Sequence, residues 1–196
     1  MTQPLAIFAA VLNLAYLVGL AYMHFLPTGY SVMGNAVSDY CVGPYARRGK
    51  AVALLSALGA GCFLLAMLLA RAPPNAQIAE LAAYVLLKIL ILFFPTDLEG
   101  EKLTRSGLVH YLIAIAYFTL AVFFTVKLTP MLGGDAPGFG LHGTLAALAL
   151  VVWTSVWPMA ITLIPALRRV FGLFERIFIV SVAAWFLDAS LLLAAA

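Results

Sequence analysis

Two short polar segments interrupt an otherwise apolar sequence, at residues 35–44 and 94–100. Each contains an aspartate, Asp39 in the first and Asp97 in the second, and His110 follows a little further along the chain. A carboxylate that accepts a hydrogen bond from a histidine fixes the tautomer of the ring and helps it to act as a base. An Asp97–His110 pair would therefore suit acid–base catalysis, with Asp39 as a further acid or metal ligand.

Six further polar residues lie in or beside these segments and could bind a substrate: Asn35, Ser38, Tyr40, Thr96, Arg105 and His24. No hydroxyl or thiol is visibly set up beside the Asp–His pair as a nucleophile. Structural roles are open for the same residues. The aspartate after Pro95-Thr96 could accept hydrogen bonds from loop amides, and His110 could bond to a neighbouring loop.

The three histidines do not form a metal-binding pattern. His24 and His110 are expected at one depth, whereas His142 belongs to the opposite side of the membrane. The paired histidines on one helix face that many zinc sites use are absent, and so is any C-x-x-C motif. We therefore predict no metal site, and the sequence identifies no cofactor.

Lys88 and Asp188 interrupt apolar stretches and are the most costly residues to place in a membrane. A charge near the centre of a spanning helix costs roughly 3 kcal/mol, so each is a candidate functional residue. Their depths differ by ~9 Å at the rise of an α-helix, which a long lysine can nearly cover. A contact between them, direct or through water, is predicted. The alternative is that Lys88 extends toward one interface and that Asp188 is protonated or lies near the other.

The composition requires a membrane around these residues. Of 196 residues, 65% are hydrophobic and 10% are charged, whereas soluble domains have about a quarter charged. Apolar stretches long enough to cross a bilayer as helices lie at residues 4–26, 51–70, 78–94, 107–126, 140–163 and 174–193. Their length and lack of alternation argue against membrane-spanning strands. The sequence predicts an all-α bundle of six transmembrane helices, with residues 1–196 as one domain.

The distribution of basic residues predicts the orientation of these spans. The loops after the first, third and fifth spans hold eight basic residues: Arg47, Arg48, Lys50, Lys102, Arg105, Arg168, Arg169 and Arg176. The opposite side holds only Arg71 and Lys127. Because basic loops stay in the cytoplasm, both polar segments should face the cytoplasm and both termini should lie outside. No basic run suited to nucleic acid is present.

The aromatic residues of the later spans are expected to face lipid or to anchor the interfaces. They are Tyr111, Tyr117, Phe118, Phe123, Phe124, Trp153, Trp157 and Trp185. A lipid or quinone pocket could use the same rings, and the sequence does not distinguish these roles.

A Ser-Asp-Tyr…Gly-Pro loop after the first span, together with Phe-Pro-Thr-Asp (residues 94–97) and Gly107-x-x-His110, resembles domain-of-unknown-function family 998. Its members are bacterial six-helix membrane proteins of about this size, and the resemblance covers nearly the whole chain. It implies the fold and topology, a bacterial plasma-membrane location and the motif residues as the functional centre. It implies no reaction.

Three functions follow from these observations. The favoured one is the binding of a lipid-like or other amphiphilic molecule at the cytoplasmic polar cluster, possibly as an accessory subunit of a membrane protein partner. The second is an enzyme acting on an isoprenoid or lipid, with Asp39 and Asp97 as acids or metal ligands and His110 as base. The third is a small transporter or proton path that uses Lys88 and Asp188.

Overall fold

The computed structural model describes residues 2–70, 75–98, 102–162 and 164–196, which form helices and loops without any strand. The α-helices are α1 (Thr2–His24), α2 (Ala46–Leu69), α3 (Asn75–Leu90), α4 (Arg105–Met131), α5 (Gly140–Ile161) and α6 (Phe171–Ala195). Short 3₁₀ helices are η1 (Val37–Cys41), η2 (Gly43–Tyr45), η3 (Ile91–Phe93) and η4 (Pro165–Val170). Within these residues, six helices are long and apolar enough to cross a membrane, which confirms the expected architecture.

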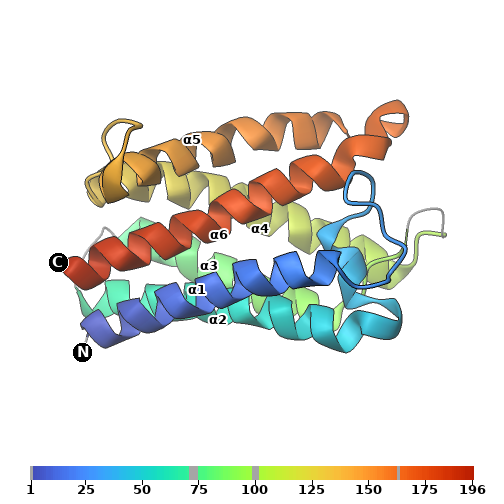
Figure 1. Cartoon of the computed structure of the whole chain (residues 1–196), viewed down its shortest axis with the longest axis horizontal. Coiled ribbons are helices and arrows are strands. Elements are labelled where there is room, and N and C mark those ends of the chain that lie inside the picture. The colour runs from blue at the N-terminus through green and yellow to red at the C-terminus, as the bar shows by residue number, and fades with distance from the viewer. Residues whose placement is uncertain (1, 71–74, 99–101, 163) are drawn as a thin grey trace.

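The six helices lie side by side along the long axis of the molecule (Figure 1). Helix α6 packs against both α1 and α5, while α1 also packs against α2, and α3 packs against α4. The N- and C-termini lie at one end of the bundle, here called the terminal end (Figure 1). Residues 25–45 and 94–98 lie at the opposite end, here called the site end.

Several helices extend beyond the predicted spans. Helix α2 begins at Ala46 rather than at residue 51 and so includes Arg47, Arg48 and Lys50. Helix α4 continues to Met131, and α6 begins at Phe171. Charged residues end a hydrophobic stretch but do not end a helix, since their side chains can reach water from the last turns. The number and approximate position of the spans were therefore predicted correctly, whereas their ends were predicted less accurately.

A cluster of buried aromatic rings fills the bundle between its middle and the terminal end. Phe63, Tyr84, Phe124, Trp185 and Phe186 contact one another with ring centroids 4.9–5.9 Å apart. The indole N–H of Trp185 donates to Thr129 Oγ1 at 2.9 Å, which satisfies its one polar group.

The prediction that the aromatic residues face lipid was wrong for several of them. Trp153 and Trp157 are 44% and 56% exposed, as expected, but Trp185 and Phe124 are 0% exposed and Phe118 is 7% exposed. In a membrane protein, lipid-facing and interior positions are both apolar, so residue type does not separate them.

Candidate functional site

The loop between α1 and α2 is folded against the site end and is organised by Asp39. This carboxylate is buried, and its Oδ2 accepts the Asn35 side-chain amide at 2.9 Å and the Ala36 backbone N–H at 3.1 Å. Tyr40 follows it in η1 and is buried as well. The backbone of Tyr40 lies so close to Gly49 of α2 that a Cβ there would overlap it. Asp39 therefore caps the turn that holds this loop on α2.

Arg176 of α6 fixes the same loop from the other side. Its guanidinium, in a residue only 6% exposed, donates to the carbonyls of Val32 at 3.0 Å and Asn35 at 2.6 Å. Its Nε donates to His24 Nε2 at 2.8 Å, and its charge lies 5.7 Å from the centre of the Tyr40 ring. Sequence reasoning treated Arg176 as a loop charge, although it lies within an apolar helix.

Glu175 was also missed, and it lies next to Arg176 in the sequence. The residue is 5% exposed, and its Oε2 accepts the backbone N–H of Val37 at 2.6 Å. The available signal was a pair of adjacent opposite charges at the start of an apolar span. Such a pair is expected to be buried and partnered rather than solvated.

The second polar segment is organised by Asp97, whose partner is Thr104 rather than His110. Asp97 accepts the Thr104 backbone N–H at 2.7 Å and the Thr104 hydroxyl at 2.8 Å. That hydroxyl in turn accepts the backbone N–H of Gly107 at 3.0 Å and so caps α4. His110 bonds instead through Nδ1 to the carbonyl of Phe94 at 2.7 Å. The Asp97–His110 hydrogen bond suggested for catalysis is absent, and both residues bond to loop groups, which was the structural alternative for each.

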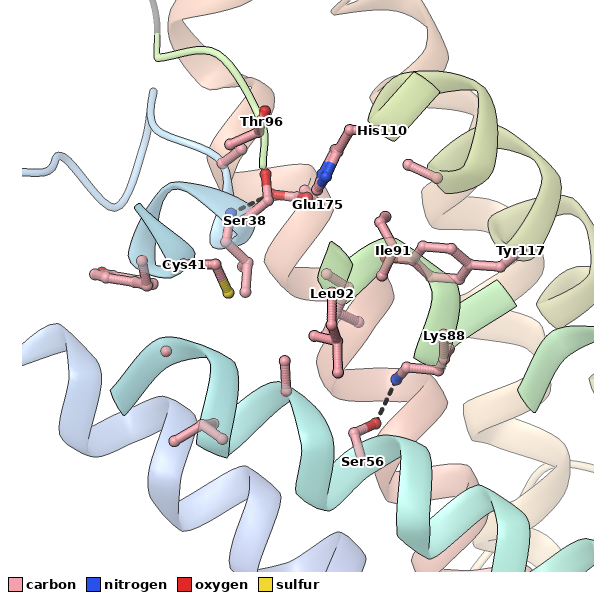
Figure 2. Close-up of a pocket in the computed structure, with 18 of the residues that line it drawn as sticks. Ser38, Cys41, Ser56, Lys88, Ile91, Leu92, Thr96, His110, Tyr117 and Glu175 are labelled. Carbon is pink, nitrogen blue, oxygen red and sulfur yellow. Dashed lines mark hydrogen bonds between the residues drawn. The ribbon is translucent and has the colours of Figure 1, made fainter. Parts of the chain in front are cut away.

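A partly enclosed cavity of about 130 Å³ lies beneath these two loops. Its walls come from η1 and from α1, α2, α3, α4 and α6, and they are mostly apolar (Figure 2). The lining spans residues 49–56 on α2, 110–118 on α4 and 171–183 on α6. At 1.5 Å per residue, these stretches correspond to a depth of roughly 10–18 Å along the bundle.

Lys88 lies at the deep end of this cavity. Its ammonium donates to the Ser56 hydroxyl across the space between α3 and α2 (Figure 2). It also lies 5.5 Å from the ring centres of Tyr16 and Tyr84, at a distance where a cation is attracted to an aromatic face. Glu175 lines the same cavity nearer the loops.

The expected contact between Lys88 and Asp188 is not formed. Asp188 belongs to the part of α6 nearer the terminal end, and its carboxyl lies beside Thr144 and His142 of α5. The contact was expected because a long lysine could nearly cover the difference in depth, but depth does not fix the direction in which a helix presents a side chain. Lys88 faces α1 and α2, whereas Asp188 faces α5.

The cavity is closed toward the terminal end by the aromatic cluster. On α2 the lining ends at Ser56, and Phe63 follows further along the helix. On α6 it ends at Ala183, and Trp185 and Phe186 follow. These rings are buried and in mutual contact. Within the described residues, the cavity is therefore a blind one that ends near Lys88.

The predicted site residues divide into two groups. Those that line the cavity are Ser38, Tyr40, Thr96, His110 and Lys88. Those that do not are Asn35, Asp39, Asp97, His24, Arg105 and Asp188. Arg105 is exposed at the first turn of α4. Asn35, Asp39, Asp97 and His24 bond to neighbouring loop or helix groups. In the described part of the chain, no three His, Cys, Asp or Glu side chains gather as metal ligands.

Cys41 adds a thiol to the cavity wall. It lies in η1 beside Asp39 and faces the cavity (Figure 2). Burial raises the pKa of the Cys41 thiol to about 11, an effect that the nearby Lys50 opposes. The thiol is therefore protonated at neutral pH and is a poor nucleophile there.

The fold and the site together define a class: a six-helix membrane protein with a blind internal cavity that ends on a lysine. Residues 8–191 match the family described as "Protein of unknown function (DUF998)", and the chain belongs to this family. This confirms the resemblance drawn from the Ser-Asp-Tyr and Phe-Pro-Thr-Asp motifs. No curated protein and no solved structure matches the chain.

Proposed function

We propose that this protein binds an amphiphilic molecule in the cavity, with the polar group of the ligand at Lys88 and Ser56. The apolar part of the ligand lies along the walls formed by α2, α4 and α6. Access is from the site end, and the proposal puts this end in the cytoplasm, in line with the distribution of basic residues. The protein acts by binding, on its own or as an accessory subunit of a membrane partner, and the host membrane is a bacterial plasma membrane.

The observation that carries this proposal is an apolar blind cavity with a lysine at its deep end. Ligand sites are mostly apolar, with a small number of placed polar groups that fix the orientation of the ligand. A lysine inside a membrane protein is costly and is retained where it serves a function. An amphiphile supplies both the apolar contacts and the polar partner that these walls offer.

The other two functions have less support. A transport path that uses Lys88 and Asp188 needs both residues along one route, and Asp188 is not among the lining residues. An enzyme that uses Asp97 as its acid needs a free carboxylate, and both oxygens of Asp97 bond to Thr104. His110 lines the cavity, but its Nδ1 bonds to the Phe94 carbonyl and not to an acidic side chain that would assist it as a base.

The test is to fill the cavity and measure the bound molecule. Ala53 of α2 lines the cavity, whereas Ala51, two residues away, is exposed and does not. We expect Ala53→Phe to lose most of the amphiphile that co-purifies with the wild type, measured by native mass spectrometry from nanodiscs. The control Ala51→Phe should keep it.

Equal amounts of bound amphiphile in Ala53→Phe and the wild type would contradict the proposal. Should Ala53→Phe fail to fold, Ala114→Leu fills the cavity from α4 with a smaller change in volume. The same loss of ligand is expected for this variant.

A further inference from the structure

The charge at the deep end of the cavity identifies the class of ligand, provided that the proposed function holds. Lys88 carries three N–H donors, and one of them goes to Ser56. The remaining contacts of its ammonium are the faces of Tyr16 and Tyr84. These partners are neutral, so within the described residues the positive charge has no carboxylate bonded to it.

Four acidic residues of the surrounding helices and loops lie away from Lys88. Asp188 lies beside α5, and Glu80 forms an ion pair with Lys127. Asp39 and Asp97 hold the backbone of their own loops. None of these four groups lines the cavity.

Glu175 is the one described acidic residue in the cavity wall, and it lies near the other end. Tyr16, which contacts Lys88, packs with Ala183 of α6. Glu175 is eight residues before Ala183, which is roughly 12 Å along the helix axis. Its Oε2 is bonded to the backbone N–H of Val37. At that separation it does not neutralise Lys88 by contact.

We infer that the ligand is an anionic amphiphile whose carboxylate or phosphate group pairs with Lys88 and completes the unfilled donors of its ammonium. A buried charge is tolerated when it is paired and hydrogen-bonded, and a low dielectric strengthens such a pair. The walls above Lys88 are apolar and accept the tail. Glu175 near the loops disfavours a second anionic group on the same ligand.

The experiment compares amphiphiles that share a ten-carbon tail and differ in the polar group. Decanoate, decyl phosphate, 1-decanol and decyltrimethylammonium are titrated at pH 7 into the protein in phosphatidylcholine nanodiscs, at matched membrane concentrations. Ligand binding to the folded state raises the melting temperature, and the concentration dependence gives an apparent Kd. We expect at least one anionic probe to bind tenfold or more tightly than decanol. Tighter binding of decanoate would identify a carboxylate as the polar group of the ligand, and tighter binding of decyl phosphate would identify a phosphate.

Substitutions of Lys88 test whether the preference for anionic probes arises in the cavity. Lys88→Met should bring the anionic probes to the Kd of decanol, and Lys88→Arg should keep most of the preference. Lys102→Met is the matched control, because Lys102 is exposed in the loop before α4 and does not line the cavity. It should keep the preference of the wild type.

The outcomes separate this inference from the proposed function. If decanol and the anionic probes bind equally tightly, or if Lys88→Met keeps the preference, the inference is wrong and amphiphile binding stands. If none of the four probes raises the melting temperature and Ala53→Phe keeps the ligand content of the wild type, both are wrong.

Discussion

At the residue scale, Arg176 joins several parts of the site end through hydrogen bonds. A guanidinium keeps its charge under all ordinary conditions and has five N–H donors to satisfy. Here it donates to three backbone carbonyls, to the Tyr40 hydroxyl and to one ring nitrogen of His24. Since Arg176 Nε can only donate, His24 Nε2 accepts and the ring proton lies on Nδ1, which donates to the Leu20 carbonyl.

This arrangement predicts energetic coupling between His24 and Arg176. We expect a double-mutant cycle with His24→Phe and Arg176→Met to give a coupling energy of about 1.5–3 kcal/mol, the range for a hydrogen bond to a charged group. The measurement is reversible unfolding in mixed micelles. Arg169→Met, at an exposed position of η4, is the control and should show no coupling to His24→Phe. Additive effects of His24→Phe and Arg176→Met would rule out the bond.

Cys41 provides a second prediction at this scale. Because the pKa of its thiol is raised to about 11, the reactive thiolate is scarce at pH 7 and increases about tenfold per pH unit up to that value. In a Cys62→Ser background, the rate of alkylation by iodoacetamide should therefore keep rising between pH 8 and about pH 11. A rate that levels off near pH 8.5, as for a free thiol, would show that Cys41 is exposed to water.

At the scale of elements, the start of α4 is joined to the preceding loop by close contact. A Cβ at Gly107 would overlap Asp97 Oδ2, so only glycine leaves room for the carboxylate that bonds to Thr104. The Phe-Pro-Thr-Asp motif and Gly107 therefore belong to one structural unit. Its role in the fold is to hold Thr96 and His110 at the mouth of the cavity.

The third prediction concerns that unit. Gly107→Ala should lower the free energy of unfolding by about 1–3 kcal/mol, as overpacking does. In an Asp97→Ala background, the same change should have little effect, because the overlapping carboxylate is gone. Gly138→Ala is the control, since a Cβ at Gly138 meets nothing within 4 Å. An equal loss of stability in both backgrounds would contradict the contact.

The sequence predicted the positions of the helices more reliably than the side of each helix that faces the interior of the bundle. Apolar length defines a span, whereas the direction of Lys88, Asp188 or Trp185 depends on rotation of a helix about its axis. The sequence contains little information about that rotation when both the lipid and the interior of the bundle are apolar. For the same reason Glu175 and Arg176 were missed. Ser38, Thr96 and His110 do line one cavity, as residues at one depth can. The pairing of Asp97 with Thr104 depended on loop geometry, which residue spacing does not determine.

At the scale of the whole molecule, the asymmetry of the basic residues gives an orientation. Both termini lie at one end of the bundle and the site loops at the other (Figure 1). The asymmetry predicts that the terminal end faces outward, so alkaline phosphatase fused after Ala196 should be active in a bacterial host. A fusion after Gly34, in the loop between α1 and α2, should be inactive. The reverse pattern of activity would place the mouth of the cavity outside.

The central proposal for the molecule is that an amphiphile binds in the blind cavity that ends near Lys88. The direct test is an experimental density map of the wild-type protein in nanodiscs of native lipid, with a rigid fusion to add mass. We expect continuous elongated density between Glu175 and Lys88, with its polar end within hydrogen-bonding distance of the Lys88 ammonium. A cavity that holds only isolated water-sized peaks, or one closed by its own side chains, would contradict it.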